Sequence, residues 1–139
     1  MSHKLSKEDL NKIKYINLKN KTSYSLMTAI GVVKDHLETC RNKGHAGLCI
    51  TDNGVMMASL DQYNVCKSEK YPSVLGNSLS IVANTDLKNL LIKPNNIGIY
   101  VKNFQGYQNA AYLTSIGTVD EKFYKTARID FFDLLTLGF

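Results

Sequence analysis

Residues 46–54 read AGLCITDNG, and this stretch decides the fold class that the sequence predicts. Its first six residues form an almost unbroken apolar run, which is typical of a strand buried in a parallel sheet. Asp52, Asn53 and Gly54 then favour a turn, and residues 55–67 are predicted to form a helix. A strand, a turn and a helix in this order form the repeating unit of α/β proteins.

The segments on either side alternate in the same way. Their apolar and β-branched content predicts short strands at residues 15–19 and 98–102, and one or two strands at residues 71–83. Helices are predicted at residues 6–14, 27–42 and 105–116, with a final amphipathic turn or helix in RIDFFDLLTL at 128–137. We therefore expect one α/β domain, spanning residues 1–139, in which helices cover a parallel or mixed sheet.

The composition excludes several classes of protein. A hydrophobic fraction of 44% and a charged fraction of 21% are ordinary for a globular chain. No apolar run approaches the roughly 18 residues that a membrane span needs. The N-terminal sequence MSHKLSKEDLNKIK is too polar for the apolar core of a secretion signal. We therefore expect a cytoplasmic protein that does not associate with membranes.

Cysteine and histidine form no recognisable metal or catalytic motif. Cys40, Cys49 and Cys66 lack a C-x-x-C pair, and we expect them to be buried or half-buried free thiols. His36 is predicted on the surface or flank of a helix, and His45 at the N-terminal end of a strand. The sequence contains no P-loop, no G-x-G-x-x-G and no Ser-His-Asp order with local context.

Positive charge gathers near the N-terminus. Residues 1–25 contain two acids, Glu8 and Asp9, and six lysines, which are Lys4, Lys7, Lys12, Lys14, Lys19 and Lys21. Such a cluster can attract nucleic acid or another polyanion. The segment has no arginine, and a solvated lysine-rich face is the alternative interpretation.

Six short motifs follow one another along residues 15–130. They are Leu18 to Lys21, Tyr24 to Ala29, Ile50 to Gly54, Val74 to Ser78, GIYVKNFQGYQNAAYLTS at 98–115, and Phe123 to Asp130. In this order they resemble the opening part of the PHP (polymerase and histidinol phosphatase) domain of C-family bacterial replicative polymerases. The family counterparts read L-H-x-H, YSLLDGA, L-T-D-H-G, I-I-G-x-E, L-L-A-K-N-x-x-G-Y-x-N-L-x-x-L-S and P-R-I-D. Each motif is short, and their shared order carries the resemblance.

The resemblance implies a distorted β/α barrel that carries metals at the carboxyl ends of its strands. Because the family domain is longer than this chain, it also implies an N-terminal portion of that domain, with a partial barrel. An incomplete barrel leaves an open sheet edge, which proteins generally cover. We therefore expect a contact with a partner or a second copy, aided by the apolar C-terminal residues Phe131, Phe132, Leu134, Leu135, Leu137 and Phe139.

The resemblance also identifies the positions where the family holds its metals with two histidines, an aspartate, a third histidine and a glutamate. Those positions are here Lys19, Lys21, Thr28, Asn53 and Ser78, and a further position that is often histidine is Asn96. A protonated lysine has no lone pair for a metal, and amides and hydroxyls replace imidazole or carboxylate poorly. Asp52 is kept, but the family pattern does not make it a principal ligand. We therefore expect no metal, no cofactor and no enzymatic activity in this chain.

Lys19 and Lys21 suggest a different use of the same positions. Alternate residues on a strand face the same way, so both ammonium groups could form a metal-free anion site. The alternative is that the pocket is dismantled and both lysines are simply solvated.

Three functions remain open. The first is a non-catalytic PHP-like module, phage or bacterial, that binds a replication protein or its own polymerase chain. The second is a small stand-alone protein that binds nucleic acid or an acidic protein through its lysine-rich N-terminal region. The third, which the residues favour least, is an active phosphoesterase with an unconventional site.

Overall fold

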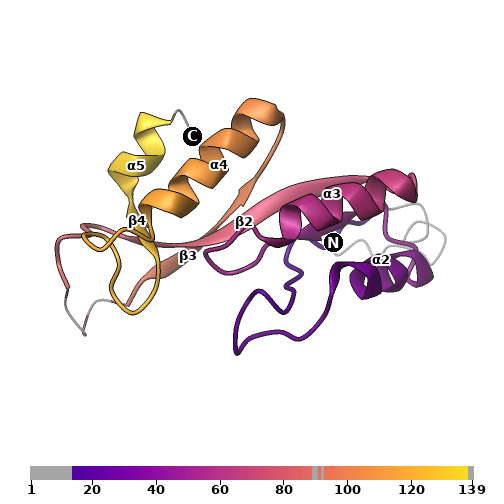
Figure 1. Ribbon diagram of the computed structural model, residues 1–139, viewed down its shortest axis with the longest axis horizontal. Helices are drawn as coiled ribbons and strands as arrows, with labels where there is room; N and C mark the ends of the chain where they lie inside the picture. Colours follow the sequence, from indigo (N-terminus) through magenta and orange to yellow (C-terminus); the bar gives the residue numbers. More distant parts are fainter. Residues whose placement is uncertain (1–13, 89–90, 92, 138–139) are drawn as a thin grey trace, which may run out of the picture.

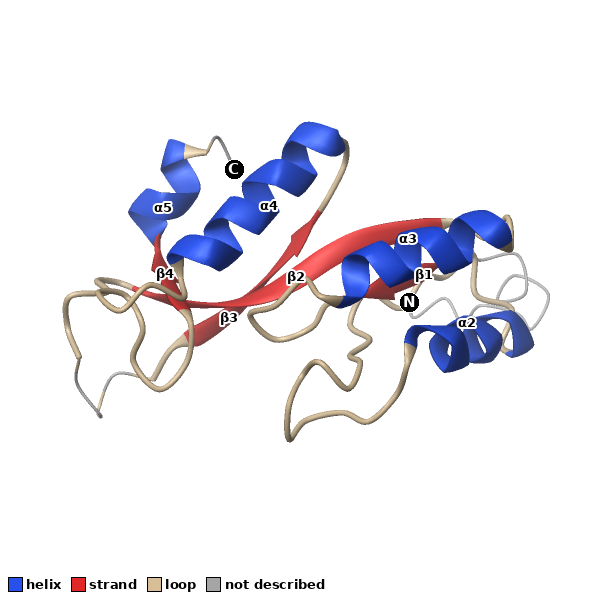
Figure 2. Cartoon of the chain, viewed as in Figure 1, coloured by secondary structure: helices blue, strands red, loops and turns tan. Residues whose placement is uncertain are grey.

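The structure is a computed structural model that describes residues 14–88, 91 and 93–137. Its elements are α2 (Val33–Asn42), β1 (Leu48–Ile50), α3 (Ala58–Ser68), β2 (Ser73–Val82), β3 (Asn95–Tyr100), α4 (Phe104–Ile116), β4 (Arg128–Asp130) and α5 (Phe131–Thr136). The predicted α/β class is confirmed, with helices and strands alternating along most of the chain (Figure 2). In this part of the chain, every helix is too short or too polar to cross a bilayer.

The sheet is built around β2, which runs the length of the molecule in Figure 1. On one edge, β1 pairs in parallel with Ser73 to Leu75, and β4 pairs in parallel with Ser80 to Val82. On the other edge, β3 pairs antiparallel with Gly76 to Ile81. The predicted mixed sheet is confirmed. Barrel closure is not confirmed, because the described strands form an open sheet.

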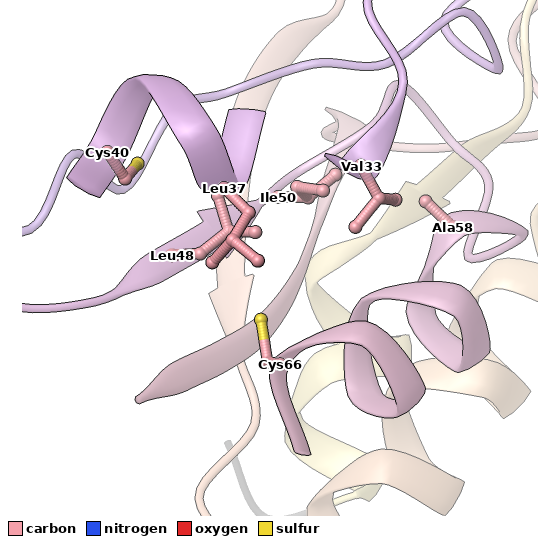
Figure 3. Close-up of a cluster of buried hydrophobic side chains, with 7 residues drawn as sticks. All are labelled: Val33, Leu37, Cys40, Leu48, Ile50, Ala58 and Cys66. Atoms are coloured by element: carbon pink, nitrogen blue, oxygen red, sulfur yellow. The ribbon is translucent and has the colours of Figure 1, made fainter. Parts of the chain in front are cut away.

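Two hydrophobic cores lie at opposite ends of β2. The first joins α2, β1 and α3 through Val33, Leu37, Cys40, Leu48, Ile50, Ala58 and Cys66 (Figure 3). The second joins β2, β3, α4, β4 and α5 through Leu79, Ile81, Ile99, Ala110, Leu113, Ile129 and Leu134. The three cysteines are buried free thiols, as the sequence predicted. Burial raises the pKa of Cys49 to about 11, so this thiol stays protonated at neutral pH.

The prediction of a strand at residues 15–19 is wrong. This segment runs beside β1, where Tyr15 O accepts from the Ala46 N–H at 2.7 Å, and the chain forms a bridge to Ile50 only at Asn20. Asparagine side chains take the place of a regular ladder. The Lys19 N–H donates to Asn17 Oδ1 at 3.1 Å, and Asn20 Nδ2 donates to Cys49 O at 2.8 Å. The first of these bonds is local, and such bonds compete with strand pairing.

Most other elements are confirmed with shifted ends. Helix α2 begins at Val33 and not near residue 27, since Met27 has a φ of 59° and cannot continue a right-handed helix. The strands predicted at 46–51 and 98–102 are Leu48–Ile50 and Asn95–Tyr100. The tail forms a short strand before its helix. Residues 6–13 of the helix predicted at 6–14 lie outside the described residues.

A capping box starts α5. The Asp130 carboxylate accepts from the Asp133 N–H, and the Asp133 carboxylate accepts from the Asp130 N–H, each at 3.0 Å. Lys122 forms ion pairs with both carboxylates. Thr85 adds a hydroxyl donor to Asp130 at 3.1 Å. The R-I-D motif therefore places a charged cap at the junction of β4 and α5.

Acid should weaken this cap. Burial alone raises the pKa of Asp130, but the Asp133 N–H, the charge of Lys122 and the Thr85 hydroxyl together lower it below its usual value. Because the folded pKa is depressed, the stabilisation is complete above about pH 4 and is lost as the pH falls through the folded pKa. We expect the native chain to exceed Asp130→Asn in free energy of unfolding at neutral pH, with the difference shrinking in acid. Urea unfolding across this range measures the difference, and a constant difference would contradict the linkage.

The outer edge of β3 has no partner strand among the described residues. The Val101 N–H donates to Leu75 O, so alternation along an antiparallel pair turns the N–H groups of Ile97 and Ile99 toward β2. The N–H groups of Gly98 and Tyr100 then point outward.

This alternation predicts an exchange pattern. In the isolated chain, the amides of Ile97 and Ile99 should exchange at least about ten times more slowly than those of Gly98 and Tyr100. Hydrogen exchange followed by NMR measures the difference. Equal protection of all four amides would show that the β3 edge is already covered, by the chain itself or by a second copy.

Candidate functional site

The carboxyl end of β1 places several polar residues side by side. Pairing with β2 continues beyond Ile50, because the Ser78 N–H donates to Asp52 O at 3.0 Å and the Gly54 N–H donates to Ser78 O at 2.7 Å. Asn53 is thereby bridged to Ser78. Gly54 then turns the chain away from the sheet with a φ of 65°, a conformation that favours glycine.

The Asp52 carboxylate organises the neighbouring turn. It accepts from the Thr22 N–H at 2.6 Å, the Thr22 hydroxyl at 2.7 Å and the Ser25 hydroxyl at 2.6 Å. Asp52 is only 2% exposed, and Thr22 and Ser25 are buried with it. The Ser25 hydroxyl in turn accepts from the Asn53 N–H at 3.0 Å. These bonds fix residues 22–25 against the end of β1.

This role of Asp52 was not predicted from the sequence. The only signal was that an acid directly follows a buried strand, while Thr22 precedes the Y-S-L turn and Ser25 lies within it. Neither pattern specifies that the two segments meet, since Thr22 and Asp52 are 30 positions apart.

Three of the five positions suggested by the resemblance are hydrogen-bonded together. The Lys21 ammonium donates to Asn53 Oδ1, and Asn53 Nδ2 donates to Thr28 Oγ1 at 3.4 Å. Ser78 is the strand neighbour of Asn53. We call Lys21, Thr28, Asn53 and Ser78 the strand-end cluster.

His36 positions the backbone of this cluster. Its Nε2 lies 2.8 Å from Lys21 O, and because a carbonyl only accepts, the ring nitrogen donates. His36 lies on α2 and is half-buried, in agreement with the predicted helix flank, and its ring faces the backbone of the cluster. Gly31 allows the ring to approach, since a Cβ there would lie 2.7 Å from Nε2.

Lys19 and Asn96 lie outside the hydrogen-bonded group. Lys19 is exposed, and residues 15–19 do not form the strand that was expected to align it with Lys21. Its charge nevertheless acts on Lys21. Burial and the charge of Lys19 lower the pKa of Lys21, whereas the charge of Asp52 raises it. Asn96 pairs with Ser80, two pairs beyond Ser78, and its Oδ1 accepts from the Ser80 hydroxyl at 3.3 Å.

The residues of the strand-end cluster do not fit a metal cluster of the family's kind. They offer an ammonium, an amide and two hydroxyls, whereas such metals prefer imidazole and carboxylate ligands. The nearby Asp52 carboxylate is engaged by three donors. Across residues 14–88, 91 and 93–137, no three His, Cys, Asp or Glu side chains gather in a way that could hold a metal ion. Positive charge and hydrogen-bond donors suit an anion instead.

This chain has a mixed sheet with polar residues at the carboxyl ends of its strands. It is therefore an α/β protein whose candidate site lies where the strands end. Residues 17–137 match the PHP domain family, and the chain belongs to this family. The resemblance seen in the sequence motifs is therefore confirmed.

The chain is similar to DNA polymerase III alpha subunits over the same region. It is 26% identical to that of Campylobacter jejuni over 104 residues, covering 74% of this chain and 9% of the relative. It is 26% identical to that of Bacillus subtilis over 102 residues, covering 73% and 9%. The Chlamydia pneumoniae subunit is 28% identical over 120 residues, covering 84% and 10%. The chain thus spans about a tenth of the length of these relatives.

The fold is also similar to a crystal structure from Bifidobacterium adolescentis, described as a candidate metal-dependent phosphoesterase. The TM-score is 0.53 at 13% sequence identity, with 75% of this chain and 33% of that chain covered. This likeness supports the PHP-like α/β architecture.

The expectation that this chain is not an enzyme is contradicted. The chain belongs to the PHP family, and its fold is similar to that of a candidate metal-dependent phosphoesterase. The expectation rested on the loss of the family's ligands at five positions. The five positions describe only the family's metal site. Their replacement argues against that site, and it was wrong to conclude from it that the chain has no enzymatic activity.

Asp52 offers a test of how the site is held. Asp52→Ala removes the acceptor for three buried donors and should cost about 3–5 kcal/mol of unfolding free energy. Asp52→Asn should cost only about 1 kcal/mol, because its oxygen still accepts and the Thr22 hydroxyl can turn to accept from the new amide. Urea unfolding measures both, with exposed Asp61→Asn as the control. Equal losses for the two Asp52 variants would show that charge, and not hydrogen bonding, holds the turn.

Proposed function

We propose that this chain is a PHP module with a structural and partner-binding role in DNA replication, acting with an alpha-type C-family polymerase chain. The observation that carries the proposal is the match of residues 17–137 to the PHP family, together with relatives that are DNA polymerase III alpha subunits. Each match covers only about a tenth of the relative. A module of this size would act through contacts with the rest of such a chain.

The surface around α5 supports a partner contact. Phe131, Phe132 and Leu135 are 63%, 76% and 71% exposed, although large apolar side chains are usually covered. A groove of about 340 Å³ between β3 and α5 lies beside them and is lined by Phe131 and Leu135. Of the other apolar tail residues, Leu134 and Leu137 pack against the second core, and Phe139 lies outside the described residues.

The proposed domain is the N-terminal portion of a distorted β/α barrel, covering residues 1–139. The outward edge of β3 supports this proposal, because a further strand could continue the sheet there. A polymerase chain is the partner that the relatives suggest, and a second copy of this chain is the alternative.

The lysine-rich region supports a second candidate function, binding to nucleic acid or to an acidic protein. Lys4, Lys7 and Lys12 lie outside the described residues, while Lys14 and Lys19 are exposed. These exposed lysines make long-range attraction of a polyanion physically reasonable.

The partner contact can be tested by direct binding. The purified chain should form a complex with the alpha-type polymerase chain of its own source, measured by calorimetry or sedimentation. Phe132→Gln combined with Leu135→Gln should weaken the complex at least about tenfold, since apolar contact residues carry much of such binding energy. Because both side chains are exposed, the variant should remain within about 0.5 kcal/mol of native stability.

The control is Leu60→Gln, which changes a 67% exposed leucine on α3. It should bind as the native chain does. The proposal fails if no complex forms, or if the control weakens binding as much as the double variant.

A further inference from the structure

The strand-end cluster holds an ammonium group that forms no ion pair with any residue that the structure describes. The described ion pairs join Arg41 to Glu69, and Lys122 to Asp130 and Asp133. Lys21 is half-buried, and its only side-chain hydrogen bond among the described residues goes to a neutral amide, Asn53. An ammonium has three N–H donors, so two remain available.

Among the described residues, the charges around Lys21 leave a net positive balance. After burial, the charge of Lys19 lowers the pKa of Lys21, and the charge of Asp52 raises it. The Asp52 carboxylate is buried and already accepts three hydrogen bonds, and it forms no described ion pair with the ammonium. An anion beside Lys21 would offset both the repulsion from Lys19 and the partial desolvation of the ammonium.

Neutral donors surround the ammonium. Thr28 and Asn53 are exposed, and Asn53 Nδ2 donates one of its two hydrogens to Thr28 Oγ1 at 3.4 Å. The Thr28 hydroxyl donates to Leu26 O at 3.2 Å, a bond that it would exchange for one to a ligand. Ser78, on the neighbouring strand, is buried, and its hydroxyl forms no hydrogen bond within the described part of the chain. A phosphate group has several acceptor oxygens and can take bonds from an ammonium and from hydroxyls together.

The cluster is held in place before any ligand arrives. Asp52 fixes the turn after Lys21, His36 holds the Lys21 carbonyl at 2.8 Å, and backbone bonds join the ends of β1 and β2. A site that is already ordered loses less conformational entropy on binding.

We propose that Lys21, with Asn53, Thr28 and Ser78 around it, binds a phosphate group without a metal, and that the exposed Lys19 adds attraction from outside. The ligand is a phosphate mono- or diester, from a free phosphorylated compound or from a nucleic-acid strand. This inference rests on the geometry of the strand-end cluster and not on the proposed polymerase partner. Either one can fail while the other stands.

Binding is tested with defined probes at low ionic strength in the presence of EDTA. The probes are inorganic phosphate, a thymidine dinucleotide with a 5′-phosphate and the same dinucleotide without it. NMR titration of the full chain should show saturable binding, with shifts at Lys21, Thr28 and Asn53. If only the 5′-phosphorylated dinucleotide and inorganic phosphate bind, the site takes a terminal phosphate. If both dinucleotides bind alike, it takes the diester backbone.

Variants separate a defined site from diffuse charge. Lys21→Met should weaken binding at least about tenfold, because it removes the ammonium and keeps the length of the side chain. Lys43→Met removes the same charge from an exposed lysine before β1, at the opposite end of that strand, and should change affinity less than about twofold. Asn53→Asp should also weaken binding at least about tenfold, since its carboxylate would pair with Lys21.

The NMR spectrum of the backbone amides shows whether Lys21→Met folds. If it does not fold, the comparison of Asn53→Asp with the native chain tests the proposal. The proposal is overturned if no probe binds saturably. It is also overturned if binding appears only when EDTA is left out, or if Lys43→Met weakens binding as much as the Lys21 or Asn53 variant.

Discussion

The site depends on one buried carboxylate. Asp52 accepts three hydrogen bonds from Thr22 and Ser25 and is almost completely enclosed. A buried charge is costly unless donors surround it, so this carboxylate strongly favours the single arrangement in which the turn meets the end of β1. The same arrangement keeps Met27 and its neighbours out of α2 and brings Lys21 to Asn53.

The central strand β2 connects this site to the rest of the molecule. Its first half pairs with β1 and accepts a hydrogen bond from Gln62 of α3, and its second half contributes Leu79 and Ile81 to the core around α4 (Figure 1). Gly76 lies where these halves meet, and a Cβ there would come within 2.8 Å of Thr51 and 2.9 Å of the Ile99 carbonyl. Close packing on both edges of β2 therefore requires glycine at this position.

The strand-end cluster occupies the positions where the family's metal ligands were expected, but its side chains are of other chemical types. The chain belongs to the PHP family, yet the groups brought together are an ammonium, an amide and hydroxyls. A cation built into the chain can attract the same phosphate oxygens as a bound metal, but it does not supply the metal's vacant coordination positions. What the site binds is therefore a separate question from whether the chain catalyses a reaction, and the sequence-based expectation was wrong to infer a lack of activity from the loss of the metal ligands.

The sequence by itself determined the α/β class, the buried strand that became β1 and the family, because apolar periodicity and motif order are local or collinear properties. It left a parallel or a mixed sheet open, and the tertiary structure decided for the mixed one with β2 at its centre. The sequence could not decide that residues 15–19 lack a ladder, since the Asn20 bond to the Cys49 carbonyl depends on where β1 lies. Only the tertiary structure decided that Lys21, Thr28, Asn53 and Ser78 meet, that Asp52 holds them and that His36 faces them. These contacts join residues 15 to 32 positions apart, and their formation depends on burial and hydrogen-bond satisfaction in the assembled fold.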